Sequence, residues 1–373
     1  MKKQVVYSKE RKSYEKKFVL SNVVYSIGVG GIHSIHTPKI FLPKDDEVIG
    51  HADVASMYPS LLIEYQWGPR HLGKLFCELF AQLKAERLEA KHTGQKVKNL
   101  FLKIVLNSPT GKMQQEVSWM YDPFNVFKIR INGQLILLIL VDRLLDLGCE
   151  IIQVNTDGVV YRAKKGLSEA ISAAIKEVES ITRLEFESDE YEAFYQYAIN
   201  DYFGVLKGGM VEEKGMFITK TNLGKGLSPV VIPKAVIAYF TEGIPVEESI
   251  KNDRDIKDFL MSQAVDKKFD VVHGENRVQR INRFYASTNG AYLFKKQKFY
   301  HFDDDTIHPR KKIESPSKDY DTQSNMLTKS GVTILNKFDD RPIEDRKINY
   351  RYYISEAKKI VSDFTEQQLE LFV

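Results

Sequence analysis

The sequence predicts an α+β fold, in which helices cover a sheet of antiparallel strands. Apolar residues recur at spacings of three and four between positions 72 and 92, which is the period of one face of a helix. Apolar and β-branched runs flank Asp157-Gly158, a dipeptide that favours the tight turn of a β-hairpin. Residues 132–147 are apolar enough to indicate a helix buried behind the sheet.

The composition is that of a folded protein with a large core. The chain has 373 residues, of which 43% are hydrophobic and 28% are charged, and this length suits roughly two or three domains. Its net charge of +4 is compatible with nucleic-acid binding but is too small to indicate it alone.

The cysteines and histidines form no metal-binding or disulfide pattern, which favours a reducing, cytoplasmic compartment. The longest apolar run, residues 135–141, is too short to span a bilayer, and no signal peptide is visible, so we expect no membrane association.

Glycines interrupt the first predicted strands, in residues 23–36. Gly28, Gly30 and Gly31 indicate either a hairpin or bulge, or a place where the backbone approaches a partner closely. Their spacing does not match a GxGxxG turn that opens a helix, so a dinucleotide site is not favoured.

Residues 48–60, VIGHADVASMYPS, combine one acid with a turn rich in free backbone N–H groups. A short strand leads to Asp53, and small residues and a Tyr-Pro pair precede an apolar helix. A carboxylate supplies hard oxygen ligands for a metal ion, and the amides around Ser56, Met57 and Tyr58 suit phosphate oxygens. The alternative is a surface aspartate that caps the helix.

Residues 72–92 and 96–106 predict a helical hairpin. Arg87 and Lys91 share one face of the first helix because they are four positions apart. Such a face is either simply solvated, or it forms with Lys103 of the second helix a positive jaw that grips a triphosphate.

Later elements alternate between helices and strands. Asn107-Ser108-Pro109 predicts a sharp turn that ends the second helix, and residues 126–131, VFKIRI, predict a strand. The hairpin at 149–163 would hold Asp157 rigidly at an exposed tip. The remaining expected elements are a helix at 167–182, strands at 184–187 and 202–207, a hairpin at 208–217, amphipathic helices after Gly224, strand-like runs at 280–288 and 291–296, an irregular polar stretch at 301–345, and a helix at 346–364.

Asp53 and Asp157 both end predicted strands of one sheet. Two carboxylates brought together there would hold two divalent cations for in-line displacement at a phosphorus atom. In such chemistry, most of the catalysis comes from positioning the reacting groups and neutralising the charge of the phosphate oxygens. The basic residues of the predicted helical hairpin are of the type that neutralises this charge.

Three motifs resemble those of family B DNA polymerases, in the order of that family. DVASMYPS at 53–60 resembles motif A (DxxSLYPS), KIVLNSPTG at 103–111 resembles motif B (KxxxNSxYG), and VNTDGV at 154–159 resembles motif C (YxDTDS). The resemblance runs from Val24 to Gly215 and more loosely to the C-terminal end, in the style of bacteriophage polymerases. Three ordered motifs are far more specific than any one of them.

The resemblance implies a polymerase right hand with an antiparallel-sheet palm, helical-hairpin fingers and a mainly helical thumb. The segments would be 1–47, leading into the palm; 48–68, the palm with motif A; 69–108, the fingers; 109–222, the palm with the end of motif B and with motif C; and 223–373, the thumb and C-terminal region. The function implied is template-directed addition of deoxynucleotides to a primer 3′-OH by two-metal-ion phosphoryl transfer.

Residue roles follow from the same resemblance. Asp53 and Asp157 would be the catalytic metal ligands, assisted by the main-chain carbonyl of Val54, for two Mg²⁺ ions that Mn²⁺ could replace. The implied nucleotide-binding residues are Ser56, Met57, Tyr58 (which would exclude a ribose 2′-hydroxyl), Arg87, Lys91, Lys103 and Asn107. The implied DNA-binding residues are Gly30, Gly31, Tyr202 and Lys214. The implied partners are primer–template DNA, deoxynucleoside triphosphates and a separately encoded exonuclease or replication accessory protein, and a viral source would place the chain in the host cytoplasm.

Four positions depart from the family pattern. Asn155 replaces the first acid of motif C, Thr110 the tyrosine of motif B, Asn200 the lysine of the primer-binding KxY element, and Gly28 the tyrosine of a YxGG element. Nothing before Gly28 resembles a 3′–5′ exonuclease, so we expect no proofreading by this chain. The spacing between the motifs leaves no room for the insertions of protein-primed relatives. Two alternatives stay open: a catalytically impaired, polymerase-like nucleic-acid-binding protein, and an unrelated two-metal nuclease or transferase.

Overall fold

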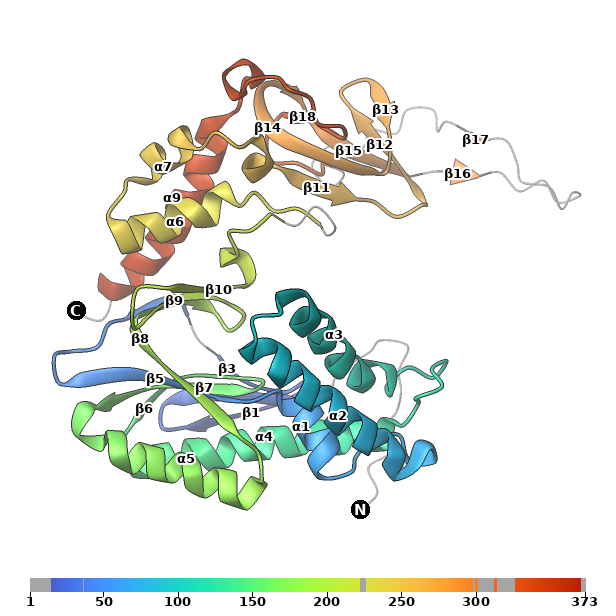
Figure 1. The fold of residues 1–373 in the computed structure, drawn as a ribbon. Coiled ribbons are helices and arrows are strands. Elements are labelled where there is room, and N and C mark those ends of the chain that lie inside the picture. Colours follow the sequence, from blue (N-terminus) through green and yellow to red (C-terminus); the bar gives the residue numbers. More distant parts are fainter. Residues whose placement is uncertain are drawn as a thin grey trace, which may run out of the picture. The chain divides into compact units, whose positions relative to one another are not determined.

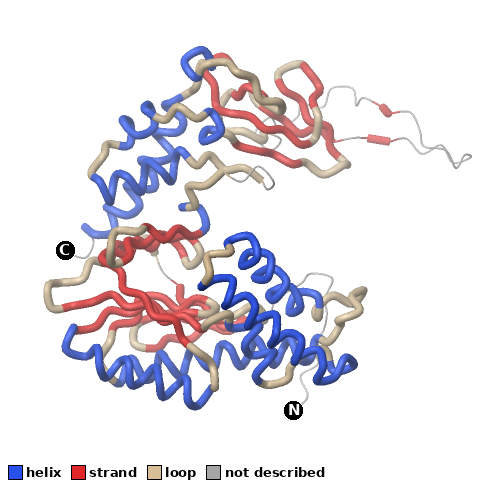
Figure 2. The backbone as a smooth tube through the Cα atoms, in the orientation of Figure 1, coloured by secondary structure: helices blue, strands red, loops and turns tan. Residues whose placement is uncertain are grey.

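The computed structural model describes residues 15–35, 37–221, 226–297, 299–300, 312–313 and 326–369. The chain divides into two compact units, Met1–Glu212 and Glu213–Val373. Both units combine helices with antiparallel strands, so the predicted α+β class is confirmed (Figures 1 and 2).

One antiparallel sheet organises the first unit. Its strands are β1 (Glu15–Leu20), β2 (Val23–Gly28), β3 (Ile32–Ile35), β4 (Lys39–Phe41), β5 (Glu47–Val54), β6 (Glu150–Asn155), β7 (Gly158–Lys164), β8 (Phe186–Ala198), β9 (Asp201–Leu206) and β10 (Val211–Lys214). The strand order is β1-β2-β3-β6-β7-β5-β8-β9-β10, and β4 pairs with β8. This order brings β5 next to β7, although a long stretch of sequence separates them (Figure 1).

Two helices, α4 (Pro123–Asp146) and α5 (Ser168–Thr182), cover one face of this sheet. The short helix α1 (Met57–Glu64) packs against α4, and α2 (Gly73–His92) and α3 (Lys96–Lys112) form the predicted helical hairpin, which packs against α1. In Figure 1, α4 and α5 lie along the same side of the sheet. Leu137 and Leu140 of α4, Val178 of α5, and Val154 and Val159 of the sheet are all fully buried in one core. Burial of each such side chain contributes about 1.5–3 kcal/mol.

The glycines of residues 23–36 form a hairpin, which was one of the two alternatives. β2 and β3 pair, and the Gly28 N–H donates to the Gly31 carbonyl at 3.2 Å across the turn. The hairpins predicted around Asp157-Gly158 and at 208–217 are also present, as β6–β7 and β9–β10.

Residues 126–131, predicted as a strand, lie inside α4, so this prediction is wrong. Asp122 caps the helix, since its Oδ1 accepts the Asn125 N–H at 3.3 Å, and a proline occupies the first helical turn. Val126 and Ile129 are buried three positions apart, on a face that continues along the helix. In so short a window, β-branched residues at helical spacing resemble a strand.

The turn predicted at Asn107-Ser108-Pro109 is also wrong, because α3 continues through it with Pro109 inside the helix. A proline has no N–H to donate to the carbonyl four residues earlier, which here is that of Val105. The Ser108 hydroxyl donates to that carbonyl instead, at 2.9 Å. This side-chain bond satisfies the group that the proline leaves open, so the helix continues.

Within the described residues, α4 is the one helix long and apolar enough to span a membrane by composition. Its most apolar window has a mean hydropathy of 1.5, and half of that window is buried inside the protein. The core helix of a folded domain passes the same test, and α4 packs against α1, α5 and the sheet.

The second unit is mixed, although the resemblance implied a mainly helical region. Its helices are α6 (Val231–Glu242), α7 (Val246–Asn252) and α9 (Tyr350–Leu369). One sheet contains β11 (Met261–Ala264), β14 (Ile281–Ala291) and β18 (Val332–Ile334); a second contains β13 (Asn276–Val278), β12 (Phe269–His273) and β15 (Leu293–Gln297); and β16 (Phe299–Tyr300) pairs with β17 (Lys312–Ile313). The strand-like runs of the sequence therefore formed β14 and β15. Much of the stretch expected to be irregular, 301–345, lies outside the described residues.

Candidate metal and nucleotide site

Asp53 and Asp157 stand at adjacent strand ends of the first unit's sheet. β5 pairs with β7 so that Asp53 lies opposite Gly158, the residue after Asp157. A β carbon added at Gly158 would lie only 3.1 Å from Asp53 Oδ1, so the Asp53 carboxylate lies against the β6–β7 hairpin tip. The Val54 N–H donates to the Asp157 carbonyl at 2.8 Å. Two acids that are distant in sequence are therefore neighbours across two strands.

The hairpin tip that carries Asp157 is anchored to β3. Thr156, the first residue of the two-residue turn, is left-handed, with a φ of 52°. The Thr156 N–H donates to the Ile32 carbonyl at 3.0 Å, and its hydroxyl lies 3.3 Å from Nε2 of His33. Asp157 itself is exposed, as predicted. The tip is thus fixed while its acid remains accessible.

A buried tyrosine lies among three carboxylates here. Burial, reinforced by the negative charges of Glu212, Asp157 and Asp53, raises the pKa of Tyr202. The Tyr191 hydroxyl donates a hydrogen bond to Glu212. Tyr202 is only 6% exposed and packs against Phe194 in a buried cluster, so its ring is not on an open surface. No motif in the sequence marks Glu212, because only the pairing of β9 with β10 brings it here.

The donors fit a metal ion that arrives with a polyphosphate. Among the described residues, no group of three or more His, Cys, Asp and Glu side chains is arranged to bind a metal. Mg²⁺ in nucleotide-processing enzymes is usually bound by one or two carboxylates, with water and substrate phosphates completing the shell. Asp53 and Asp157 meet that requirement, and their hard oxygens suit Mg²⁺ or Mn²⁺.

The N-terminus of α1 directly follows the first acid. Ser56 is left-handed, with φ 51° and ψ 52°, and its side chain does not cap the helix. Its hydroxyl instead accepts a short hydrogen bond from the Arg87 guanidinium. Helix N-termini present unpaired N–H groups to anions, here those at Met57 and Tyr58. Met57 is 3% exposed, so it offers a ligand its backbone and not its side chain.

Tyr58 lies beside the glycine turn and the second acid. Its hydroxyl donates to the Gly30 carbonyl at 2.9 Å. Burial raises the pKa of Tyr58; the positive charge of Arg130 opposes this shift and Asp157 reinforces it. Arg130 Nε is buried and, within the described part of the chain, has no hydrogen-bond partner. Arg130 is not among the residues predicted from the sequence, because a strand at 126–131 would not place it on the helical face that α4 gives it.

Two basic residues of α2 contact acceptors next to the acids. Arg87 donates to Ser56, as described above. Lys91 Nζ lies 2.8 Å from Glu187 Oε1, and Glu187 pairs with Asp53 in the β5–β8 register. The two cations expected to hold a triphosphate therefore bind protein oxygens around the site.

The remaining predicted residues lie on α3, at the glycine turn and at the end of β10. Lys103 and Asn107 are exposed on α3, one turn apart. Gly31 is near the tip, since a β carbon added there would lie 3.7 Å from Thr156. Lys214 ends β10 beyond the boundary between the units and is not placed relative to the acids.

Asn155, which departs from motif C, is bonded on both sides. Its Nδ2 donates to the Ile199 carbonyl at 2.8 Å and to Asn200 Oδ1 at 3.2 Å. Its Oδ1 accepts from the Thr156 hydroxyl at 3.1 Å. Asn155 thus ties the hairpin tip to the β8–β9 turn.

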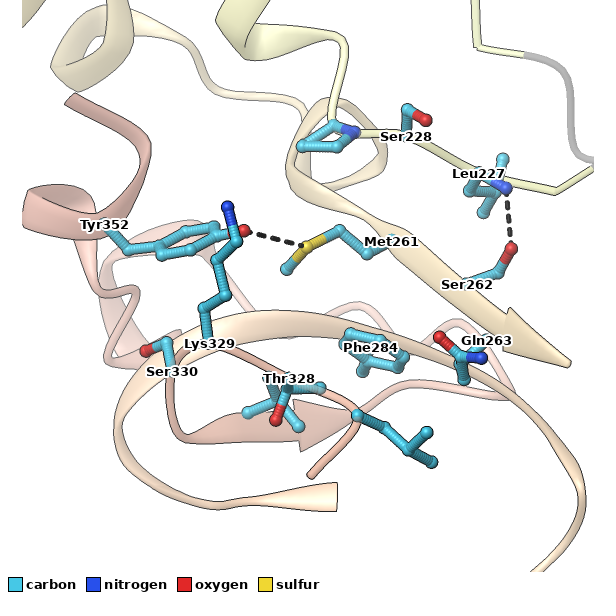
Figure 3. A pocket seen from close by; sticks show the side chains of 13 residues that line it. Leu227, Ser228, Met261, Ser262, Gln263, Phe284, Thr328, Lys329, Ser330 and Tyr352 are labelled. Carbon is cyan, nitrogen blue, oxygen red and sulfur yellow. Dashed lines mark hydrogen bonds between the residues drawn. The ribbon is translucent and has the colours of Figure 1, made fainter. Parts of the chain in front are cut away.

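A cavity of about 280 Å³ lies separately within the second unit (Figure 3). Phe284 and Met261 contribute apolar walls, and the Tyr352 hydroxyl lies 3.7 Å from Met261 Sδ. Ser262 Oγ accepts the Leu227 N–H at 2.6 Å. None of the predicted site residues is among those that line it.

No protein-family model matches the chain. No curated protein matches it either. Among solved structures, the chain is similar to the family B DNA polymerase from the hyperthermophilic archaeon Pyrobaculum calidifontis, with 16% sequence identity and a TM-score of 0.43. The similarity covers 89% of this chain and 46% of that polymerase, so the chain spans about half of its length.

Proposed function

We propose that this chain is a DNA-directed DNA polymerase of the family B type, a nucleotidyltransferase that adds deoxynucleotides to a primer 3′-OH. One observation carries the proposal: the Asp53 carboxylate lies against the hairpin tip that presents Asp157. Both acids belong to motifs that resemble those of the family, and the motif between them lies in α3, the second helix of the basic helical hairpin.

Asp53 and Asp157, together with the carbonyl of Val54, would hold two Mg²⁺ ions. Such ions, when bound, lower the pKa of an attacking hydroxyl and neutralise a leaving pyrophosphate. The chain's own contribution is positioning. The anchored tip fixes Asp157 relative to Asp53, and the buried Tyr202 keeps a hydroxyl among the carboxylates.

The nucleotide would bind between α1 and α2. Arg87 would exchange the neutral Ser56 hydroxyl for a phosphate oxygen, which forms a stronger charge-assisted bond. Lys91 would exchange one charged acceptor, the Glu187 carboxylate, for another. The amides that open α1 add further donors, Lys103 adds a third cation, and Asn107 would line the base-pair pocket. The hydrogen bond from Tyr58 to Gly30 fixes the ring that would exclude a 2′-hydroxyl.

The remaining assignments extend this proposal. Gly30, Gly31 and Lys214 would contact primer–template DNA, with Tyr202 acting from inside the site. A polymerase of bacteriophage type would work in the host cytoplasm, with an exonuclease or replication accessory protein as its partner. The right-hand division into palm, fingers and thumb belongs to the same proposal.

A catalytically impaired, nucleic-acid-binding relative is the second candidate. The hydrogen bonds of Asn155 favour it, because this residue replaces an acid and its side chain is engaged on both sides. Primer–template binding without incorporation in Mg²⁺ or Mn²⁺ would support this candidate.

Primer extension with deoxynucleotides and Mg²⁺ tests the two candidates. We expect the wild-type chain to extend a primer, and Asp157→Asn to lower the rate by more than about 100-fold, since even residues that only support metal ligands cost about 10- to 100-fold. Asp146→Asn, an exposed acid at the end of α4, removes the same charge and serves as the control. Equal, negligible extension by the wild type and Asp157→Asn would contradict the proposal.

A further inference from the structure

Aromatic and basic side chains gather where α4 begins, in the first unit. Phe124 is 54% exposed, and the Arg70 guanidinium and the Lys128 ammonium lie 5.0 Å and 4.7 Å from the centre of its ring. Lys128 also lies 5.9 Å from the centre of the Trp67 ring. These four residues are called the aromatic–basic cluster below.

A buried carboxylate holds this cluster in place. Asp122 is 3% exposed and accepts from Arg70 Nε at 2.9 Å and from its terminal nitrogen at 3.1 Å. The same carboxylate caps α4, so the helix start and the guanidinium are fixed together. Asp122 is paired with Arg70, and among the described residues Lys128 contacts the two rings and makes no ion pair.

The backbone of a further aromatic residue lies close to the cluster. The Trp119 carbonyl lies 2.8 Å from Nε2 of His71, which follows Arg70 in the chain, and the Trp119 side chain is 68% exposed. Segments 67–74 and 112–130, which contribute these residues, carry five Lys or Arg residues and two acids. Arg70 is paired with the buried Asp122, and Arg130 Nε is buried. The remaining charges are those of Lys74, Lys112 and Lys128 against that of Glu116, so the exposed rings lie in segments with an excess of positive charge.

This chemistry suits a single-stranded nucleic acid. Bases stack on exposed aromatic rings, while cations between the rings bind the phosphates, and this combination tolerates any sequence. Exposed aromatic residues are also frequent in protein interfaces. The excess of cations over accessible acids favours a polyanion over a protein of mixed charge.

We propose that the aromatic–basic cluster binds single-stranded nucleic acid, and that its ligand is the unpaired template strand. The identity of the strand rests on the proposed polymerase function, whereas the binding itself does not. The cluster would guide template ahead of the site that contains Asp53 and Asp157.

Binding of a fluorescein-labelled oligothymidylate, followed by anisotropy in EDTA without nucleotides, tests the binding. We expect Phe124→Ala to weaken it about 5- to 100-fold, since one stacked base contributes about 1–3 kcal/mol. Phe124→Trp keeps a ring and should retain affinity. Lys128→Met should reduce the slope of log affinity against log salt concentration by about 0.7, the loss of one phosphate contact.

Matched controls come from α5. Ile181→Ala removes a side chain that is 56% exposed, and Lys176→Met removes an exposed charge; neither should change binding. Unchanged affinity in both Phe124→Ala and Lys128→Met would overturn the proposal. So would self-association of the chain that Phe124→Ala abolishes while oligonucleotide affinity stays the same.

A second comparison separates this proposal from the polymerase assignment. The chain should bind a duplex with a single-stranded template overhang more tightly than a blunt duplex, and Phe124→Ala should remove the difference. If this holds but no primer is extended, the polymerase proposal fails and the binding site stands. If primers are extended but the overhang makes no difference in the wild type, the template assignment is wrong.

Discussion

Replacing Gly158 with alanine perturbs the candidate site at the point where its two acids meet. The new β carbon would lie 2.6 Å from His51 Nε2 and 3.1 Å from Asp53 Oδ1. Gly158 does not have a left-handed φ, so alanine fits its backbone conformation. The crowded atoms are the ends of side chains on β5, which can rotate without moving the strand.

The size of the effect follows from these distances. Atoms in ordinary contact are about 3.5–4.0 Å apart, so the His51 ring must retreat by about 1 Å and the Asp53 carboxylate by about 0.5 Å. A misplacement of about 1 Å at a catalytic group can cost about 100-fold in rate. We therefore expect kcat/KM for primer extension to fall about 10- to 100-fold. The free energy of unfolding should fall by about 1 kcal/mol, the low end of the cost of overpacking, because the crowded side-chain ends can relax.

Primer-extension kinetics and urea denaturation, measured on the same preparation, check both parts. Gly166→Ala is the matched control, because a β carbon there meets no atom within 4 Å. Wild-type rates in Gly158→Ala would refute the role of this contact. The role would also be refuted if the loss of activity equalled the fraction of the variant that is unfolded under the assay conditions.

Two further predictions concern Tyr58 and Asp122. Tyr58→Ala should raise the use of ribonucleotides relative to deoxynucleotides by about tenfold or more, because it removes the ring that would meet a 2′-hydroxyl; an unchanged ratio in competition assays would exclude that role. Burial raises the pKa of Asp122, but hydrogen bonds from Arg70 and the Asn125 N–H outweigh it and hold this pKa below its usual value. Its stabilising contribution is therefore present above the unfolded-state pKa of about 3.9 and is lost as the pH falls through the lower folded-state value. Asp122→Asn should lower the free energy of unfolding by about 1–2 kcal/mol at neutral pH, and the difference from wild type should shrink below about pH 4 in urea titrations; a constant difference would contradict this.

Local patterns predicted the elements that carry the acids. The dipeptide Asp157-Gly158 between two apolar runs was enough to predict the β6–β7 hairpin, because the conformation of a tight turn is set by the residues within it. The spacing of apolar residues at 72–92 was sufficient for α2. The rule that a proline ends a helix failed at Pro109. There the Ser108 hydroxyl donates the hydrogen bond to the Val105 carbonyl that the proline cannot donate.

The composition of the site depended on strand order, which no local pattern encodes. Glu187 stands beside Asp53 only because β8 pairs with the free edge of β5. Glu212 reaches Tyr202 only because β10 adds to β9. Neither glutamate lies in a motif, so their approach to the acids could be found only from the folded chain.

Asn155 and Asn200, two positions that depart from the motif pattern, contact each other. A hydrogen bond of 3.2 Å joins their two neutral amides. Asn155 also accepts a hydrogen bond from the Thr156 hydroxyl, so one side chain ties the hairpin tip to the β8–β9 turn. That tip carries Asp157, and the β5–β7 register places it beside Asp53. Asn155 therefore acts on the tip through hydrogen bonds, and the proposed phosphoryl transfer would depend on Asp53 and Asp157 for its carboxylates.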